Sequence, residues 1–197
     1  NVIFILAVSA YGTPIGDRAI WGNPLIARAG GPPPPPPPTG TRFDFGTASS
    51  PLASGYSRVS ETTAYTPGSY GWTDITGLES RDRSAVADDL KRDFVMHSSA
   101  ARTFKVDLPN GVYSANILMG DNDFAHDNMV VKANGTTVLA DVDSAVGVFT
   151  ANSFSVTVSG GSLSLEFSDG GGTDLTWVVN SLSLTSAPPP PPADCDR

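Results

Sequence analysis

Cysteine is almost absent from this chain, with Cys195 as the one example among 197 residues. A single thiol excludes a disulfide framework and a cysteine-based zinc site. Basic residues are also scarce, because 12 Lys and Arg stand against 20 Asp and Glu and give a formal net charge of −8. Nucleic-acid binding needs a basic surface, so this composition argues against a nucleic-acid partner. The longest apolar run, Val2 to Val8, is far shorter than the ~20 residues of a membrane-spanning helix.

Proline, by contrast, is concentrated in two tracts, at 32–38 and 188–192. Consecutive prolines adopt the extended polyproline II conformation and act as semi-rigid spacers. The tracts predict four parts: a leader at 1–31, a proline-rich spacer at 32–41, a compact domain at 42–184 and a proline-rich tail at 185–197. We expect the native chain to continue beyond Arg197, because the tail ends without a structural reason to stop.

Short runs of alternating apolar and polar residues fill the region 42–184. This period of two is typical of half-buried β-strands. Two Asn-Gly pairs and one Ser-Gly-Gly-Ser segment predict three β-hairpins. Their strands are 103–108 with 112–119, 129–133 with 136–140, and 154–158 with 163–167.

The pattern predicts an all-β fold, an antiparallel β-sandwich or jelly roll. Only 84–94 lacks the alternation and could form one or two helical turns. The residues expected to face the core are Val106, Leu108, Ile117, Val156, Leu165 and Trp177.

An ordered set of motifs in the same region carries a family resemblance. The motifs include Phe43-Asp44-Phe45-Gly46, Phe104-x-Val106-Asp107-Leu108-Pro109-Asn110-Gly111-x-Tyr113 and Trp177-Val178-Val179-Asn180. With them, residues 42–184 resemble the non-catalytic N-terminal domain of bacterial rhamnogalacturonan acetylesterase-type enzymes. The resemblance implies a galactose-binding-like β-sandwich related to carbohydrate-binding modules. It also implies that this domain is not itself an enzyme.

The sequence likewise predicts no catalytic site, since the chain has two histidines and no Gly-x-Ser-x-Gly elbow. One oxygen-rich segment could hold a structural Ca²⁺ ion, through Asp121, Asn122, Asp123 and Asp127. The alternative is a polar loop whose side chains accept hydrogen bonds from backbone amides. The same two interpretations apply to Asp169 and Asp174, which flank three glycines.

Carbohydrate binding would need exposed aromatic rings, because the C–H faces of sugars stack on them. The best candidate surface combines Tyr65, Tyr70 and Trp72 with Arg81, in a stretch whose composition suits a loop. The alternative is that Trp72 is a core residue, as we expect for Trp177. The neighbouring arginines and aspartates could equally form ion pairs inside the fold.

Asn134 begins an Asn-Gly-Thr sequence at a predicted hairpin tip. This pattern is an acceptor for N-linked glycans, and a hairpin tip leaves room for one. We therefore regard Asn134 as a candidate glycosylation site.

The leader begins with an uncharged apolar segment, residues 1–10. An exposed strand of this kind aggregates unless it is paired, and the proline spacer separates it from its own domain. We expect this N-terminal extension strand to be donated to a neighbouring subunit, with an intramolecular strand or a signal-peptide remnant as alternatives. The predicted subunit-contact residues are Val2, Ile3, Phe4, Ile5, Leu6 and Val8.

Two functions from different classes follow from these observations. The main hypothesis is an extracellular structural protein, a subunit of a head-to-tail fibre built by strand donation between copies of the chain. The alternative is a non-catalytic carbohydrate-binding module of a secreted enzyme that degrades pectin. Both hypotheses predict a secreted or cell-surface protein, whose partner is itself or a polysaccharide.

Overall fold

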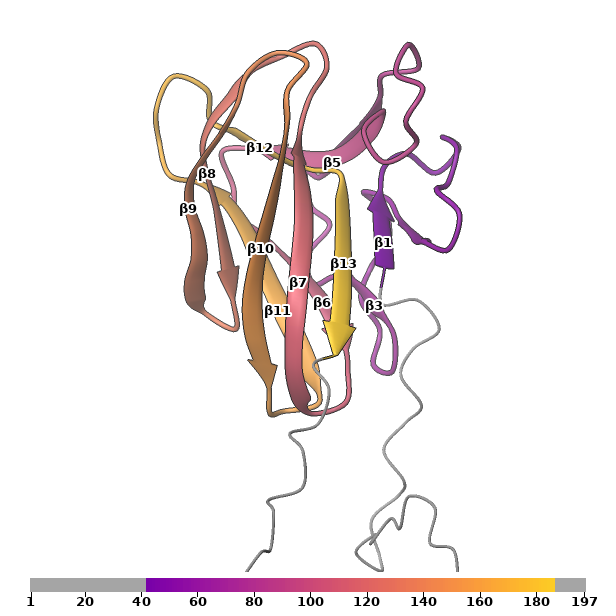
Figure 1. The fold of residues 1–197 in the computed structure, drawn as a ribbon, viewed down its shortest axis with the longest axis vertical. Coiled ribbons are helices and arrows are strands. Elements are labelled where there is room, and N and C mark those ends of the chain that lie inside the picture. Colours follow the sequence, from indigo (N-terminus) through magenta and orange to yellow (C-terminus); the bar gives the residue numbers. More distant parts are fainter. Residues whose placement is uncertain (1–41, 187–197) are drawn as a thin grey trace, which may run out of the picture. The chain divides into compact units, whose positions relative to one another are not determined.

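Thirteen β-strands make up the regular structure of residues 42–186, which is the part of the chain that the computed structural model describes (Figure 1). The predicted leader and spacer lie outside these residues, and so do the predicted subunit contacts from Val2 to Val8. The predicted tail lies outside them from residue 187 on, because residues 185 and 186 belong to the last strand. The strands are β1 (Arg42–Phe45), β2 (Ser57–Val59), β3 (Tyr70–Trp72), β4 (Glu79–Asp82), β5 (Asp93–Ser98), β6 (Arg102–Asp107), β7 (Gly111–Gly120), β8 (His126–Ala133), β9 (Thr136–Ser144), β10 (Phe149–Val158), β11 (Ser162–Asp169), β12 (Thr176–Val179) and β13 (Ser181–Ser186).

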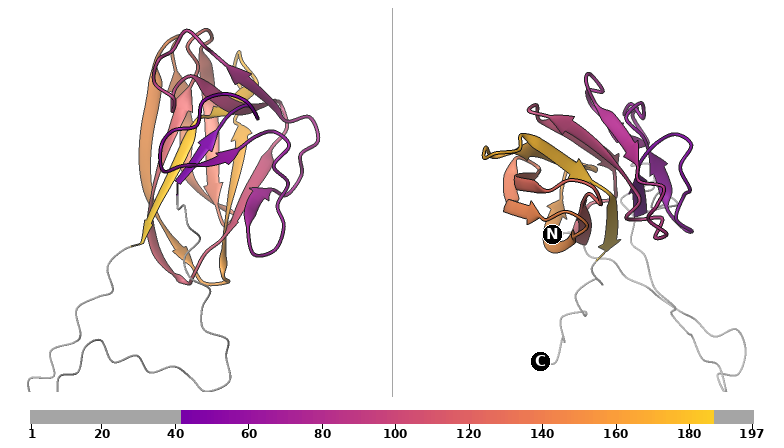
Figure 2. Two further views of the ribbon diagram at one scale, coloured as in Figure 1. Left: turned by 90° about the vertical axis from the view of Figure 1, so that its right-hand side faces the viewer. Right: turned by 90° about the horizontal axis from the view of Figure 1, so that it is seen from above.

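The strands form a β-sandwich, as the alternation predicts. One five-stranded sheet has the order β10-β7-β13-β1-β2, and a second has the order β3-β6-β11-β8-β9 (Figures 1 and 2). A smaller sheet of β12, β5 and β4 adjoins them. All pairs of strands are antiparallel except β1 and β2, which run parallel with Phe43 opposite Ser57.

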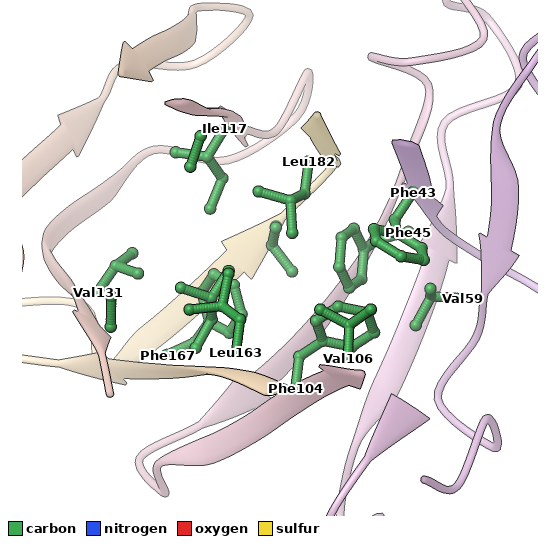
Figure 3. Close-up of a cluster of buried hydrophobic side chains, with 14 of the residues drawn as sticks. Phe43, Phe45, Val59, Phe104, Val106, Ile117, Val131, Leu163, Phe167 and Leu182 are labelled. Carbon is green, nitrogen blue, oxygen red and sulfur yellow. The ribbon is translucent and has the colours of Figure 1, made fainter. Parts of the chain in front are cut away.

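Inward-facing apolar side chains from the two large sheets fill the space between them (Figure 3). Phe43 and Phe45 of β1 meet Phe104 of β6 edge to face, with 5.1 Å between ring centroids in both pairs. Such aromatic contacts add to the free energy gained by burying the rings. The six residues expected in the core are all buried, so that prediction is confirmed.

The hairpin predictions are confirmed in one case and wrong in two. Strands β8 and β9 pair across Asn134-Gly135, with Ala133 opposite Thr136. Strands β6 and β7, however, lie in different sheets, and so do β10 and β11. The turn at Pro109–Asn110 therefore crosses the sandwich, and the hydroxyl of Tyr113 donates to the carbonyl of Pro109 to hold the crossing (2.9 Å).

The segment 84–94 contains turns instead of the predicted helical turns, and β5 begins at Asp93. Three of its backbone amides donate to carbonyls three or four residues earlier, but the pattern does not continue into a helix. Within residues 42–186 we find no helix that is long and apolar enough to cross a membrane.

The two ends of the sandwich differ in what they carry. Strand β13 ends beside the start of β7, with Ser186 opposite Tyr113, and Arg42 pairs with Ser183. Both ends of the described chain therefore lie at the lower end of the sandwich in Figure 1. The opposite end carries the loops 121–125, 145–148 and 170–175, which we call the loop end.

Candidate functional site

The loop end exposes apolar side chains to an unusual degree. Phe124 is 60% exposed, and Val146, Val148 and Leu175 are each more than half exposed. Only three other large hydrophobic side chains are exposed within residues 42–186: Leu52, Ile75 and Val112. Four of the seven exposed large hydrophobic side chains of residues 42–186 therefore lie on these three loops, which makes the loop end a candidate binding surface.

Phe124 is held in place by a cation. The guanidinium of Arg83 lies over its ring, 5.3 Å from the centroid, and also over the ring of Phe94, at 5.4 Å. Arg83 thus joins the exposed ring to the buried one by two cation–π contacts. This packing holds the ring of Phe124 in a fixed position.

Asp121 fixes the position of Arg83 from the other side. Its two carboxylate oxygens accept hydrogen bonds from Nε and Nη2 of Arg83, at 2.8 and 2.7 Å, and one of them also accepts the amide of Asp123, at 2.9 Å. Burial raises the pKa of Asp121, but the hydrogen bonds from Arg83 and Asp123 outweigh it, so the pKa lies below its usual value. The pair is therefore a fixed ion pair at neutral pH.

The loop 170–175 is tied to the loop end by His126 and Asp127. His126 is buried, and its Nδ1 lies 2.6 Å from an oxygen of Asp174. The carboxylate of Asp127 accepts hydrogen bonds from the backbone amides of Thr173 and Asp174 and from the Thr173 hydroxyl. A Cβ at Gly172, where φ is +121°, would lie 2.7 Å from Asp127 Oδ2, so this close approach needs glycine.

The four candidate calcium ligands do not converge. Asp121 accepts hydrogen bonds from Arg83, and Asp127 accepts them from the loop 170–175. The side-chain amide of Asn122 donates to Asp123 (2.8 Å). Among the residues that the structure describes, no group of three or more His, Cys, Asp or Glu side chains could hold a metal ion. Asp169 likewise accepts the amide of Gly171, at 2.7 Å. These contacts favour the polar-loop interpretation, and the calcium site stays an untested prediction.

Chelation tests the two interpretations directly. We expect excess EDTA to leave the midpoint of thermal unfolding unchanged to within about 1 °C, because only a ligand bound to the native state adds stability by mass action. Differential scanning fluorimetry with and without EDTA measures this. A drop of several degrees that added Ca²⁺ reverses would support the calcium site instead.

The candidate carbohydrate surface does not exist as an exposed platform. Trp72 is 1% exposed and donates its indole N–H to the carbonyl of Ser60 (3.1 Å), so it belongs to the core. Tyr70 packs on Phe43, with 4.8 Å between centroids. The prediction that Trp72 lies on a binding surface is therefore wrong. Burial of its large apolar ring stabilises the sandwich, as is usual for large apolar side chains.

Of the other two members of that surface, Tyr65 stays next to Trp72, because its backbone amide donates to the Trp72 carbonyl (2.8 Å), whereas Arg81 belongs to another sheet. The hydroxyl of Tyr65 donates to Asp107 (2.9 Å), and the ammonium of Lys105 lies over its ring. Arg81 is exposed on β4 of the small sheet and pairs with Glu79. The expected internal ion pairs are present, as in Arg92 with Asp82 (2.8 Å).

Asn134 lies at the tip of the turn between β8 and β9, with φ at +48°. Its side-chain oxygen accepts the amide of Ser164 (3.0 Å), and its amide donates to the carbonyl of Thr157 (3.3 Å). The side chain thus ties this turn to its neighbours. Glycosylation of Asn134 stays a prediction.

Phe124 was missed by reasoning from sequence, although its segment was singled out. The signal was one aromatic residue in the middle of the polar run Asp121 to Asp127. Val146, Val148 and Leu175 gave no such signal, because apolar residues near strand ends are usually core residues.

The comparisons with known proteins agree with this architecture. Residues 41–185 match the family model described as beta-agarase/YXIM esterase-like, galactose-binding domain-like. Beta-agarase A of Zobellia galactanivorans is 36% identical over 161 residues, which are 81% of this chain and 29% of the agarase. Among solved structures, the YxiM protein of Bacillus subtilis matches with a TM-score of 0.60 and 26% identity, over 74% of this chain and 39% of that one.

A plant receptor-like kinase, FER, shares the fold alone, with a TM-score of 0.54 and 14% identity over 75% of this chain and 42% of that one. The chain spans 29% of the agarase and 39% of the YxiM chain, so it corresponds to one part of these relatives. The expected resemblance to a galactose-binding-like domain of esterase-type enzymes is confirmed. The chain belongs to the beta-agarase/YXIM esterase-like, galactose-binding domain-like family.

Proposed function

We propose that residues 42–186 form a non-catalytic carbohydrate-binding module, which attaches a larger secreted enzyme to a galactose-containing polysaccharide. The observation that supports this most is the exposed apolar surface of the loop end, with Phe124 at 60% exposure beside carboxylates. Sugar C–H faces stack on aromatic rings, while sugar hydroxyls donate to carboxylates. A fixed aromatic ring beside acceptors suits such a ligand.

The direction of the chain ends supports the same proposal. The described chain begins and ends at the lower end of the sandwich, and the loop end lies opposite (Figure 1). In a longer protein, connections from Arg42 and Ser186 would leave the loop end free to face a polymer. The agarase is such a longer protein, because this chain covers 29% of its length.

The module hypothesis replaces the fibre hypothesis as our main interpretation. The fibre depends on residues 1–10, which lie outside the described residues, and strand donation stays an untested prediction. The module accounts for the family and for the relative named as a beta-agarase. That name points to agar instead of the pectin that the first resemblance suggested.

Replacing Phe124 with Ala should weaken binding of the 197-residue chain to agarose by about tenfold, because the stacking surface is lost. Affinity electrophoresis in native gels, with and without soluble low-melting agarose, measures the dissociation constant. The matched control is Val112→Ala, which removes an exposed apolar side chain at the other end of the sandwich and should bind like the parent. Equal loss in both variants, or binding unaffected by Phe124→Ala, would contradict this site.

A further inference from the structure

The loop end is strongly acidic. Its loops carry Asp121, Asp123 and Asp174, and the adjoining ends of β8, β9 and β11 add Asp127, Asp143 and Asp169. The loops 121–125, 145–148 and 170–175 contain no Lys or Arg. Among the described residues, Arg83 is a cation in contact with these aspartates, and the imidazole of His126 also lies against two of them.

Neither Arg83 nor His126 is available to an anionic ligand. Arg83 donates from Nε and Nη2 to Asp121, and its Nε lies 3.1 Å from Asp123. Its guanidinium also lies over the rings of Phe94 and Phe124. The hydrogen bond to Asp121 raises the pKa of Arg83, so its charge is permanent but already paired. His126 is 6% exposed and lies between Asp174, at 2.6 Å, and Asp121, at 3.8 Å.

Some of the carboxylates face solvent next to the apolar side chains. Asp123 precedes Phe124 in the chain, and its side chain is 47% exposed. Asp174 precedes Leu175, and its side chain is 34% exposed. Such carboxylates accept hydrogen bonds from neutral hydroxyls but repel a carboxylate or a sulfate ester, because like charges brought together oppose binding.

We infer that the loop end selects uncharged galactose-containing polysaccharides and rejects polymers that bear uronate or sulfate groups. This inference rests on the proposed function, and it names the class of polymer. The selectivity comes from the exposed carboxylates of Asp123 and Asp174 beside the apolar side chains, since Arg83, the cation in contact with Asp123, is already paired with Asp121. It also argues against pectin, whose backbone is rich in uronate.

The test compares three soluble polymers in affinity electrophoresis of the 197-residue chain: low-melting agarose, chemically sulfated agarose and polygalacturonate. At 20 mM NaCl we expect the two anionic polymers to bind at least about tenfold more weakly than agarose. At 500 mM NaCl the difference should narrow, because salt screens exposed charges. Sulfated agarose shares its backbone with agarose, so the comparison isolates the charge.

A variant locates the effect. Asp123→Asn should narrow the difference between agarose and sulfated agarose several-fold at 20 mM NaCl, since it removes an exposed charge beside Phe124. Glu166→Gln, on β11 in the middle of a sheet, changes the net charge equally and should leave the difference unchanged.

Equal affinity for agarose and either anionic polymer at 20 mM NaCl would overturn the inference and leave the proposed function intact. Binding to none of the three polymers would overturn both. An equal effect of Glu166→Gln would mean that net charge, and not the loop end, produces the selectivity, which also overturns the inference.

Discussion

Replacing Asp93 with Asn is expected to stabilise the protein at pH 8 by up to about 4 kcal/mol, and to change its stability little at pH 4. Asp93 begins β5 and is completely buried. One of its oxygens accepts the hydroxyl of Ser50, and the other has no hydrogen-bond partner. An ionised carboxylate in this position costs far more free energy than a neutral amide does.

No cation within the described residues contacts the Asp93 carboxylate. The positive charge of Arg58 acts on Asp93, but its guanidinium donates to the carbonyls of Thr47 and Ser50 and to the Ser50 hydroxyl. Burial is the largest cause that raises the pKa of Asp93 from 3.8 to about 7. The hydrogen bond from Ser50 and the charge of Arg58 lower this pKa, while the charges of Asp44 and Asp82 raise it. The buried carboxyl therefore keeps its proton well above the pH at which an exposed one loses it.

The direction of the pH effect follows from proton counting. Between about pH 4 and pH 7 the unfolded chain has released the proton of Asp93, while the folded chain retains it. The unfolded state then binds fewer protons, so this group makes the free energy of unfolding fall as the pH rises through that window. The fall is about 1.4 kcal/mol per pH unit and ends near pH 7.

Urea unfolding of the parent and of Asp93→Asn, at each unit from pH 4 to pH 8, measures the difference between them. The difference isolates Asp93 from the other carboxylates, several of which shift the opposite way, as Asp121 and Asp127 do. Asp141→Asn, at an exposed position on β9, is the control and should show no such trend. A difference that is constant across the range would show that Asp93 is ionised in the folded protein throughout.

Replacing Trp72 with Ala is expected to lower the free energy of unfolding by about 3–5 kcal/mol. Its ring lies at the centre of an aromatic cluster, with centroids 5.7 Å from those of Phe45 and Phe104, and 5.9 Å from those of Phe167 and Trp177. The substitution leaves a large cavity and removes one of the two donors to the Ser60 carbonyl, which also accepts the amide of Thr63. Trp72→Phe keeps most of the apolar volume and should cost clearly less.

Urea unfolding at one pH, together with agarose binding at a temperature where each variant is folded, separates the two roles that the sequence allowed for Trp72. A core residue changes stability and leaves the affinity of the folded protein near that of the parent. An exposed platform residue would do the reverse. Ile75→Ala, which truncates an exposed side chain, should change stability by less than about 1 kcal/mol.

The candidate site was only partly visible in the sequence. The segment Asp121 to Asp127 stood out because its polar residues interrupt the alternating pattern. The ion pair between Arg83 and Asp121 could not be predicted from the sequence, since Arg83 lies 38 residues before Asp121 and belongs to the segment after β4. Which aromatic residue is exposed was also not visible, because Trp72 and Phe124 both occur in segments that composition describes as loops.

Alternation by itself located the strands from residue 103 on and showed which of their faces is buried, because successive side chains of a strand point to opposite sides. It therefore predicted the sandwich and its core correctly, although it did not locate β1 to β5. It did not determine which strands pair, because a short turn can join two strands of one sheet or cross to the opposite sheet, and both arrangements bury the same inward side chains.

That choice was made by the tertiary structure, in which β6 pairs with β3 and β11, and β7 with β10 and β13. The same choice brings 121–125, 145–148 and 170–175 to one end of the sandwich, where no local pattern could place them together. Ladder hydrogen bonds and core packing join residues far apart in the chain, so they decide the site, whereas side-chain alternation is local and decides only the strands.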